Sequence, residues 1–216
     1  MKPLLTLLLT LFICTNLFAT AQAPDKIIYK GIVYSLYNYP LEDYFKKNPD
    51  KRPKSEVMST GLTRGYVATF EVRENQLFLK DIKIGYVDTT AIQSSRYKWQ
   101  SVLNDVFPNQ KDIKIDWLTG LLEIPHGEIL KYGITGYGKN NNYILLEIFK
   151  GDLKKEKHLN YIEYEKFKER QFQAFKQTDE YLKIKYDFQN KGTSDKHIDS
   201  HLRSFIIEYT SKILTE

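Results

Sequence analysis

Apolar and polar residues alternate along two neighbouring stretches, Tyr66–Val72 and Leu77–Ile82. Alternation with a period of two is typical of strands that bury one face. Glu74-Asn75 lies between the two stretches, and asparagine tolerates the positive φ angles that a two-residue hairpin turn requires. The pattern therefore predicts an antiparallel hairpin with Glu74-Asn75 as its turn.

The pattern on either side of this hairpin is less regular. Two short apolar runs around Lys30-Gly31 predict a small hairpin or one bent strand over Lys26–Tyr37. Pro40–Phe45 predicts one or two helical turns, because proline is favoured at the first position of a helix. The polar stretch Tyr86–Gln100 is expected to be loop, and Ser101–Pro108 is expected to be a short helix that ends at its proline.

The middle of the chain predicts four further strands, separated by turn-forming residues. They are expected at Ile113–Trp117, Leu121–Ile124, Ile129–Ile134 and Tyr143–Phe149. Pro125-His126-Gly127 is expected to form a turn, and Gly151 is expected to end the β region. With the earlier elements, these segments make a body of about seven strands.

Beyond Tyr161 the apolar residues recur with helical spacing and predict two helices. The first stops at Lys191-Gly192, and the second is capped by Ser194 or Asp195. The apolar faces are expected to contain Phe172, Phe175, Leu182 and Tyr186 in the first helix and Ile198, Leu202, Phe205, Ile206, Tyr209 and Ile213 in the second. The sequence thus predicts the α+β class. An antiparallel β-rich body over about 26–153 precedes two C-terminal helices over about 161–215, in one domain of residues 22–216.

The first residues are typical of a secretory signal peptide. One lysine precedes a short apolar run, Leu4–Ile13, and small residues follow it. The run is shorter than the roughly 20 residues that span a bilayer. Cleavage after Ala21, which removes residues 1–21, is preferred over cleavage after Ala23, because the latter would place Pro24 directly beyond the cut. The protein is therefore expected to be exported, to the periplasm or out of the cell.

Cys14, the single cysteine, lies within this segment. A lipid anchor at Cys14 would need a small residue before it, and the branched Ile13 argues against one. A mature chain without Cys14 must be held by an ordinary core rather than by disulfide bonds. No later segment is apolar enough to span a membrane, so an integral membrane protein is not expected. The net charge of +5 is modest, which disfavours nucleic acid as a partner.

Arg64-Gly65 directly precedes the first strand of the predicted hairpin. In one interpretation the guanidinium forks around an anionic group, and the glycine lets a ligand or backbone approach closely. In the other, Arg64 pairs with an internal acid such as Glu71, Asp81 or Asp116, and Gly65 relieves a bend. The second interpretation is favoured, and Arg64 is kept as a candidate ligand-binding residue.

Aromatic residues are frequent, with 16 Tyr and 12 Phe, which suits half-buried strands and also ligand-contact surfaces. In the segment Asp116–Gly120, Trp117 could stack on a sugar while Asp116 accepts a hydrogen bond from one of its hydroxyl groups. Equally, Trp117 could be the largest core residue of its strand, and this interpretation is favoured. Trp117 and Tyr137 are the aromatic candidates for ligand binding.

The histidines are weaker candidates. His126 is expected on a turn, where ligand-binding and catalytic groups often sit, but no recognisable partner orients it. His197 and His201 lie four residues apart on the last predicted helix, and with Asp195 they could bind a divalent metal. No further ligand follows from local spacing, so no metal site and no cofactor are predicted.

Three glutamates, Glu123, Glu128 and Glu147, raise the possibility of paired carboxylates, which glycoside hydrolysis requires. The sequence contains no GxSxG, P-loop, HExxH or dinucleotide-binding motif. These absences weigh against the best-known enzyme classes.

The segments "RGYVATFEV" with "LFLKDI", "IDWLTGLLEIPHG", and "GITGY" with "YILLEIFKG" follow one another between about Pro40 and Gly151. In these segments the chain resembles a group of uncharacterised exported bacterial proteins. The resemblance implies a shared β-rich body and no mechanism, because no activity is established for the group. The two predicted C-terminal helices look like an addition to that body.

Three hypotheses follow. The favoured one is an exported, non-catalytic binding or interaction module of the cell envelope, whose partner is an envelope protein, a peptide or a glycan. Its candidate ligand-binding residues are Arg64, Trp117, Tyr137 and His126. The second hypothesis is a hydrolase acting on glycan or peptide, with acids from the strands and His126 nearby. The third is a secreted inhibitor that docks on another protein.

Overall fold

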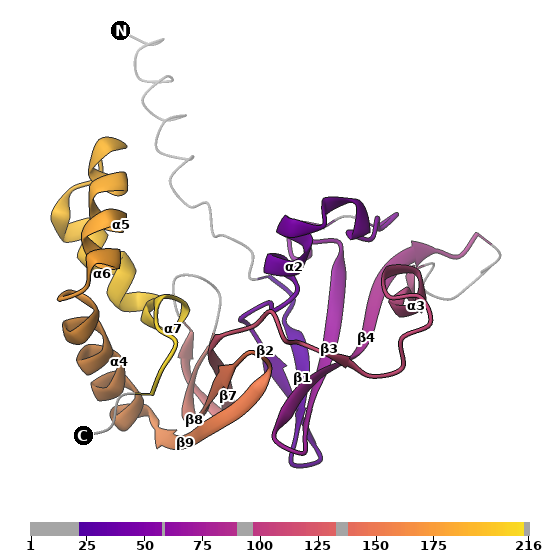
Figure 1. Cartoon of the computed structure of the whole chain (residues 1–216), viewed down its shortest axis with the longest axis horizontal. Helices are drawn as coiled ribbons and strands as arrows, with labels where there is room; N and C mark the ends of the chain where they lie inside the picture. Colours follow the sequence, from indigo (N-terminus) through magenta and orange to yellow (C-terminus); the bar gives the residue numbers. More distant parts are fainter. Residues whose placement is uncertain (1–21, 58, 90–96, 133–137, 214–216) are drawn as a thin grey trace, which may run out of the picture.

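The computed structural model describes residues 22–57, 59–89, 97–132 and 138–213. In this part of the chain nine strands form one sheet, and helices follow it towards the C-terminus (Figure 1). The coarse prediction of a β-rich chain with C-terminal helices is therefore confirmed. The predicted signal peptide with Cys14, and the candidate residue Tyr137, lie outside the described residues.

The sheet is mostly antiparallel. Its strands are β1 (Asp25–Tyr29), β2 (Ile32–Leu36), β3 (Tyr66–Arg73), β4 (Gln76–Val87), β5 (Tyr97–Ser101), β6 (Ile113–Lys114), β7 (Gly120–Tyr132), β8 (Gly138–Phe149) and β9 (Asp152–Asn160). Their order is β2-β1-β3-β4-β9-β8-β7, and β5 and β6 also pair with β4. Within the described residues, β1 and β3 run parallel and the other strand pairs are antiparallel.

The helices form two groups. Short α2 (Glu42–Lys47), the 3-10 turn η1 (Pro49–Lys51) and α3 (Leu103–Val106) belong to the β body. The C-terminal group contains α4 (Tyr161–Phe175), α5 (Asp179–Asn190), α6 (Asp195–Ser204) and α7 (Ile206–Tyr209), gathered at one end of the molecule in Figure 1. Across the described ranges, no helix combines the length and the apolar character that a membrane span needs.

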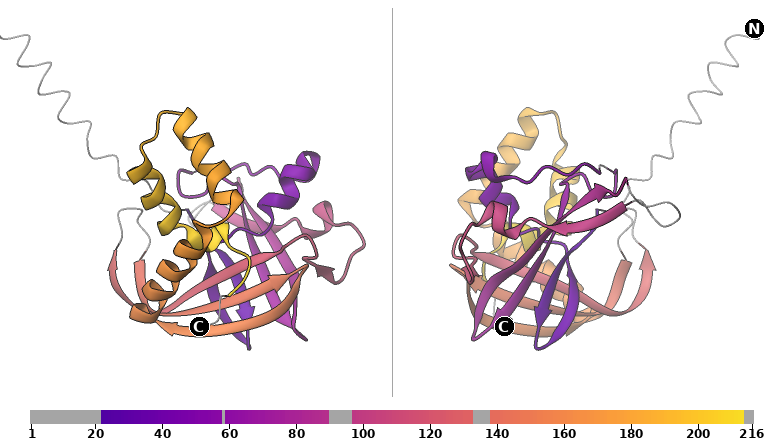
Figure 2. Two further views of the ribbon diagram at one scale, coloured as in Figure 1. Left: turned by 60° about the vertical axis from the view of Figure 1, so that its left-hand side comes forward. Right: turned by 90° about the vertical axis from the view of Figure 1, so that its right-hand side faces the viewer.

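The sheet curls, so that its two terminal strands, β2 and β7, lie against each other (Figure 2). From Tyr143 to Ile148, strand β8 is buried on both faces. Ile144, Leu146 and Ile148 enter an inner core inside the curl, whereas Tyr143 and Leu145 enter an outer core under the C-terminal helices. The C-terminal helices therefore cover the outer face of the curled sheet.

The predicted hairpin is confirmed. Strand β3 pairs with β4, and Glu74 and Asn75 form the turn with φ angles of 49° and 56°. Lys30-Gly31 forms a similar turn between β1 and β2. Gly65 has a φ of 79°, which residues with a side chain rarely adopt, so this glycine lets the chain turn directly before β3.

Several predicted strand boundaries are wrong. Gly151 does not end the β region, because Lys150-Gly151 is another hairpin turn and β9 follows it. Pro125-His126-Gly127 is not a turn between strands but part of the long strand β7, which has a bulge after His126. Tyr97–Ser101 forms β5 although all five of its residues are exposed. In β9 the many solvent-facing lysines weaken the apolar alternation that would reveal a strand, whereas β5 alternates but exposes its two aromatic residues, Tyr97 and Trp99.

Each of the two predicted C-terminal helices is divided in two. Thr178 separates α4 from α5, and its Oγ1 accepts a hydrogen bond from the backbone N–H of Tyr181. Leu182 and Tyr186 are consequently not on a common buried face with the α4 residues, and their exposed fractions are 59% and 63%. Phe205 separates α6 from α7. The apolar spacing continues across both breaks, so the sequence pattern alone does not reveal them.

Candidate functional site

An open cleft of about 380 Å³ lies between the sheet and the C-terminal helices. The segment Tyr37–Tyr39, which follows β2, forms one wall, and residues of α4, α6 and α7 form the opposite side. Strands β7 and β8 contribute Glu123, Lys139 and Tyr143 between them. This volume is at the lower end of the range for small-molecule sites. The cleft therefore suits a small ligand or one side chain of a larger partner.

Glu123 is the central acidic group of the cleft. It is half-buried on β7, and its Oε2 accepts a 2.6 Å hydrogen bond from the hydroxyl of Tyr164. Burial raises the pKa of the Glu123 carboxyl, against the lowering effects of the Tyr164 hydrogen bond and the charge of Lys168. The negative charges of Glu208 and Glu165 raise this pKa further. Glu123 thus holds its proton to a higher pH than an ordinary glutamate.

Two stacked tyrosines connect the sheet to α4 beside Glu123. The rings of Tyr143 and Tyr164 are 3.8 Å apart between centroids and almost parallel, at 7°. Burial raises the pKa of Tyr143 to about 12 and that of Tyr164 well above its ordinary value. Both phenols therefore stay protonated at physiological pH. Tyr164 acts as a fixed hydrogen-bond donor to Glu123 rather than as an acid or base.

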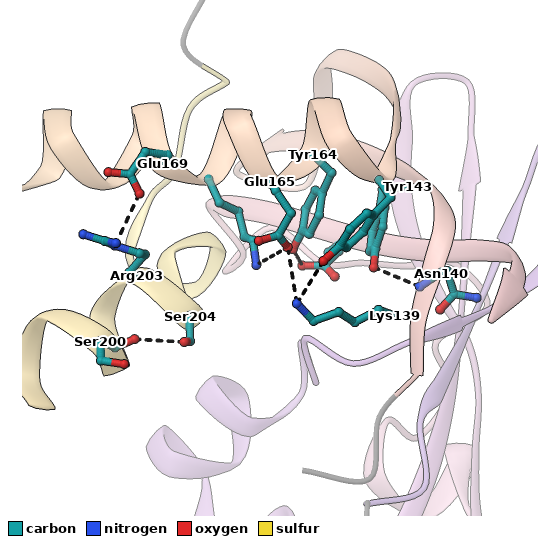
Figure 3. Close-up of polar contacts among 12 residues, drawn as sticks. Lys139, Asn140, Tyr143, Tyr164, Glu165, Glu169, Ser200, Arg203 and Ser204 are labelled. Carbon is teal, nitrogen blue, oxygen red and sulfur yellow. Dashed lines mark hydrogen bonds and ion pairs between the residues drawn. The ribbon is translucent and has the colours of Figure 1, made fainter. Parts of the chain in front are cut away.

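The two lysines of the cleft share one carboxylate. Lys168 and Lys139 place their ammonium nitrogens 3.0 Å and 3.9 Å from Oε1 of Glu165. Lys139 also donates a 3.2 Å hydrogen bond to the hydroxyl of Tyr161, and Figure 3 shows its side chain extended toward Glu165, near Tyr164. Within the described ranges, neither Glu123 nor Glu208 has an ion pair. Both lysines of the cleft are therefore paired with Glu165.

Three distant residues hold the wall segment Asn38–Pro40. The Oδ1 of Asn38 accepts a 2.8 Å hydrogen bond from the backbone N–H of Glu123. The guanidinium carbon of Arg64 lies 3.6 Å from the ring centroid of Tyr39, a residue with an unusual φ of 50°. The carbonyl of Pro40 accepts a 3.1 Å hydrogen bond from the indole N–H of Trp117. Arg64 and Trp117 therefore support a wall of the cleft from behind.

The side chain of Arg64 is only 9% exposed, and it does not line the cleft. Its Nη2 donates a 2.7 Å hydrogen bond to the carbonyl of Ala23 and lies 3.5 Å from the Oδ1 of Asp25. Asp25 is fully buried, and burial raises the pKa of its carboxyl to about 6 despite the charge of Arg64. Arg64 thus pairs with an internal acid, as the favoured interpretation predicted. That acid is Asp25 rather than any of the three acids that the sequence suggested.

Trp117 is half-buried against the inner core. Its ring is parallel to that of Phe107, with centroids 6.3 Å apart, and lies 4.9 Å from that of Tyr44. It sits in a turn after the two-residue strand β6, so the predicted strand over Ile113–Trp117 is too long. This placement matches the favoured core interpretation of Trp117.

His126 and two of the three predicted acids, Glu128 and Glu147, do not line the cleft. His126 contacts Tyr34 of β2, with ring centroids 5.8 Å apart, whereas Glu123 on the same strand contacts α4. Burial lowers the pKa of His126, and the nearby His158 lowers it further. Glu128 is exposed, and Glu147 accepts a 2.8 Å hydrogen bond from the backbone N–H of Ile213. Of the three predicted acids, Glu123 alone lines the cleft.

His197 and His201 belong to the helical surface. His197 is hydrogen-bonded through Nδ1 to Ser194, at 2.7 Å, and His201 packs near the rings of Phe188 and Phe205. In the ranges that the structure describes, no group of three or more His, Cys, Asp and Glu residues is placed to hold a metal ion.

The sequence reasoning missed most of the groups around Glu123. Tyr164, Glu165 and Lys168 are on α4, and Glu208 is on α7. The spacing of Glu165 and Lys168 does predict a pair on one helix face. Nothing in the sequence says that this face lies above Glu123, because their proximity depends on how the helices pack on the outer face of the sheet.

The protein was compared with family models, curated protein sequences and solved structures, and none of these matches the chain. The resemblance to exported bacterial proteins therefore stays a prediction. The arrangement of residues around Glu123 is the basis on which a function can be assigned.

Proposed function

We propose that the protein is an exported, non-catalytic binding module of the bacterial cell envelope, and that the cleft beside Glu123 holds its ligand. The observation that carries this proposal is the state of Glu123. Its carboxyl is partly removed from water, lacks an ion pair among the described residues and opens into the cleft. Removing a carboxylate from water is costly. Perturbed carboxyls of this kind in clefts are characteristic of functional sites.

The neighbours of Glu123 favour binding over turnover. The phenol of Tyr164 keeps its proton, and the two lysines are held on Glu165. His126, which is on β7 like Glu123, contacts β2 and does not line the cleft. A general base needs a partner positioned to move protons with it. The described groups around Glu123 are therefore better placed to bind and orient a ligand than to transfer protons to or from it.

A hydrolase is the second candidate, and one observation favours it. Glu165 and Glu208 are close enough to raise the pKa of Glu123. Glycoside hydrolysis uses one carboxyl with a raised pKa as the general acid and a second carboxyl group nearby. Under this alternative, Glu123 is the general acid, and its replacement by glutamine abolishes turnover.

The test is thermal unfolding of the purified chain with glycans, cell-wall peptides, free amino-acid derivatives and anionic polymers. A ligand at a hundred times its Kd adds about 2.7 kcal/mol to stability. If one class of compound raises the unfolding temperature of the wild type, we expect Glu123→Gln to abolish that increase. Glu128→Gln, on the exposed part of the same strand, is the matched control and is expected to keep the increase.

The three other outcomes are distinct. If the wild type consumes the active compound and Glu123→Gln stops this, the hydrolase replaces the binding module. If a ligand binds equally well to both variants, the site is elsewhere. If no compound class changes the unfolding temperature, the proposal of a small-ligand cleft is wrong.

A further inference from the structure

The charges that line the cleft are not balanced. Three carboxyl groups, of Glu123, Glu165 and Glu208, face two ammonium groups, of Lys139 and Lys168. Both ammonium groups form ion pairs with the carboxylate of Glu165. Glu123 on β7 and Glu208 on α7 have no ion pair among the described residues, although the charges of Lys168 and His201 act on them from a greater distance. These two elements pack against each other. A group that supplied positive charge between them would offset the cost of holding the half-buried Glu123 carboxylate beside the exposed Glu208 carboxylate.

The walls of the cleft are aromatic. Tyr37 and Tyr39 line one side, and Phe205, with an exposed fraction of 38%, lines the other. Tyr39 already contacts one cation, because the guanidinium carbon of Arg64 lies 3.6 Å from its ring centroid. Aromatic rings together with carboxylates are a recurrent way to bind alkyl ammonium and guanidinium groups.

From this geometry we infer that the cleft takes a cation, the guanidinium or ammonium group of an arginine or lysine side chain in a peptide. The inference rests on the proposed function, since it names the ligand class of the same cleft. An anionic ligand would approach two unpaired carboxylates, and a neutral sugar would leave their charges uncompensated. The volume of about 380 Å³ suits one long side chain.

A cation bound beside Glu123 favours the ionised carboxyl, so its binding is expected to release protons. The charged and titratable groups that face Glu123 are Tyr164, Glu165 and Lys168 of α4, Glu208 of α7, and Tyr143 and Lys139 of β8. Burial raises the pKa of Glu123 above its ordinary 4.5, so this carboxyl keeps its proton to a higher pH than an ordinary glutamate does. An arriving cation stabilises the ionised form, so affinity rises with pH across the range in which Glu123 titrates.

The experiment is a calorimetric titration with Nα-acetyl-arginine amide and Nα-acetyl-citrulline amide, which differ in charge and hardly in shape. We expect the arginine compound to bind at least tenfold more tightly than the citrulline compound. Binding should tighten as the pH rises from mildly acidic to neutral. Repeating the titration in two buffers of different ionisation heat should show proton release.

Variants connect the effect to the cleft. Glu123→Gln is expected to weaken binding of the arginine compound at least tenfold and to remove the proton release. Glu208→Gln changes an exposed residue and so leaves folding intact, and it is expected to weaken binding several-fold. Glu128→Gln is expected to bind like the wild type. Far-ultraviolet circular dichroism checks that each variant is folded.

The failures can be told apart. If the citrulline compound, or an acetyl-glutamate amide, binds as tightly as the arginine compound and Glu123→Gln weakens it, the cation inference is wrong and the ligand cleft survives. If Glu208→Gln and Glu123→Gln both bind the arginine compound normally, the cation binds outside the cleft. If none of these compounds binds and the unfolding screen is also silent, the proposed function itself is wrong.

Discussion

The pair of Asp25 and Arg64 is the clearest case of an electrostatic cost at the scale of single residues. Asp25 Oδ2 and two nitrogens of Arg64, Nε and Nη1, are buried and have no hydrogen-bond partner among the described residues. The Oδ1 of Asp25 accepts a 2.9 Å hydrogen bond from the backbone N–H of Ala68. The burial cost outweighs this bond and the attraction to Arg64, which is why the pKa of Asp25 is raised.

This raised pKa makes stability depend on pH. The pKa of Asp25 is 3.8 in the unfolded chain and about 6 in the folded protein. The folded state therefore binds the proton more tightly, and this contribution to stability is full below the unfolded pKa and lost as the pH rises through the folded pKa. In Asp25→Asn the contribution is absent. We expect the difference in unfolding free energy between wild type and variant to be roughly 2 kcal/mol more favourable to the wild type at about pH 4 than at about pH 8.

Urea unfolding of both proteins across this pH range measures the difference. Glu123 titrates in both proteins, so its contribution cancels. A difference that does not change with pH would show that Asp25 has an ordinary pKa in the folded protein.

Residue-scale predictions succeed where chemistry alone decides and fail where a partner must be identified. The sequence favours an internal acid for Arg64, because a charged group next to an apolar strand needs a counter-charge. It does not point to Asp25, since the two residues meet only through the parallel pairing of β1 with β3. Trp117 is similar, because its bond to Pro40 joins segments that are far apart in the sequence.

At the scale of elements, the tight turns follow from local residues, and the strands that they join are harder to recognise. Glu74-Asn75 is readable because alternating strands flank it. Lys150-Gly151 has the same geometry, with φ angles of 48° and 76°, but the strand after it is rich in lysine. Charged residues on an exposed strand discourage association with other sheets. The same residues conceal β9 from a search for apolar alternation.

The Lys150-Gly151 turn also leaves no space for a side chain at Gly151. A Cβ at Gly151 would lie 2.8 Å from the carbonyl oxygen of Ile115, whereas one at Gly31 would meet nothing within 4 Å. Both glycines have positive φ, so alanine at either site costs about 1–2 kcal/mol in backbone energy. We expect Gly151→Ala to lower the unfolding free energy by at least about 1 kcal/mol more than Gly31→Ala.

Chemical denaturation of the two variants measures this, with Gly31→Ala as the matched control. Equal losses would mean that the Ile115 backbone moves aside at no cost. A smaller loss at Gly151 would contradict the closeness of the two segments.

For the molecule as a whole, β8 joins the inner and outer cores. Residues at alternate positions of this strand enter one core or the other. The C-terminal helices are tied down further, since Glu147 of β8 accepts a hydrogen bond from Ile213 and Gln171 donates one to the carbonyl of Lys212. The helices and the β body are therefore expected to unfold together.

Phe167→Ala tests this expectation. Phe167 is fully buried in the outer core, and its truncation is expected to cost about 3–5 kcal/mol. Tryptophan fluorescence, which includes Trp117 beside the inner core, and circular dichroism, which reports on the helices, should shift to the same lower denaturant midpoint. Tyr186→Ala, at an exposed position of α5, should change neither midpoint appreciably. Helical signal lost before the fluorescence change would show that the helices unfold alone.

The fold class follows from the sequence because the strand period dominates up to about residue 160 and the helical period dominates after it. The cleft does not, since its groups come from the segment after β2, from the sheet and from three helices. Glu123 is readable as an acid on a strand. Its isolation from Glu128 and Glu147 depends on the bulge after His126 and on the docking of the C-terminus. The local pattern of apolar residues predicts neither the bulge nor the docking.

The wall segment Asn38–Pro40 also has a consequence for biosynthesis. A ribosome releases the chain from its N-terminus, and the partners of this segment, Arg64, Trp117 and Glu123, are all made later. The β3–β4 hairpin has its partners at hand and can form early, whereas Asn38–Pro40 must wait until β7 is complete. Until β7 is complete, this wall lacks its partners, so the cleft is expected to be among the last parts of the fold to form.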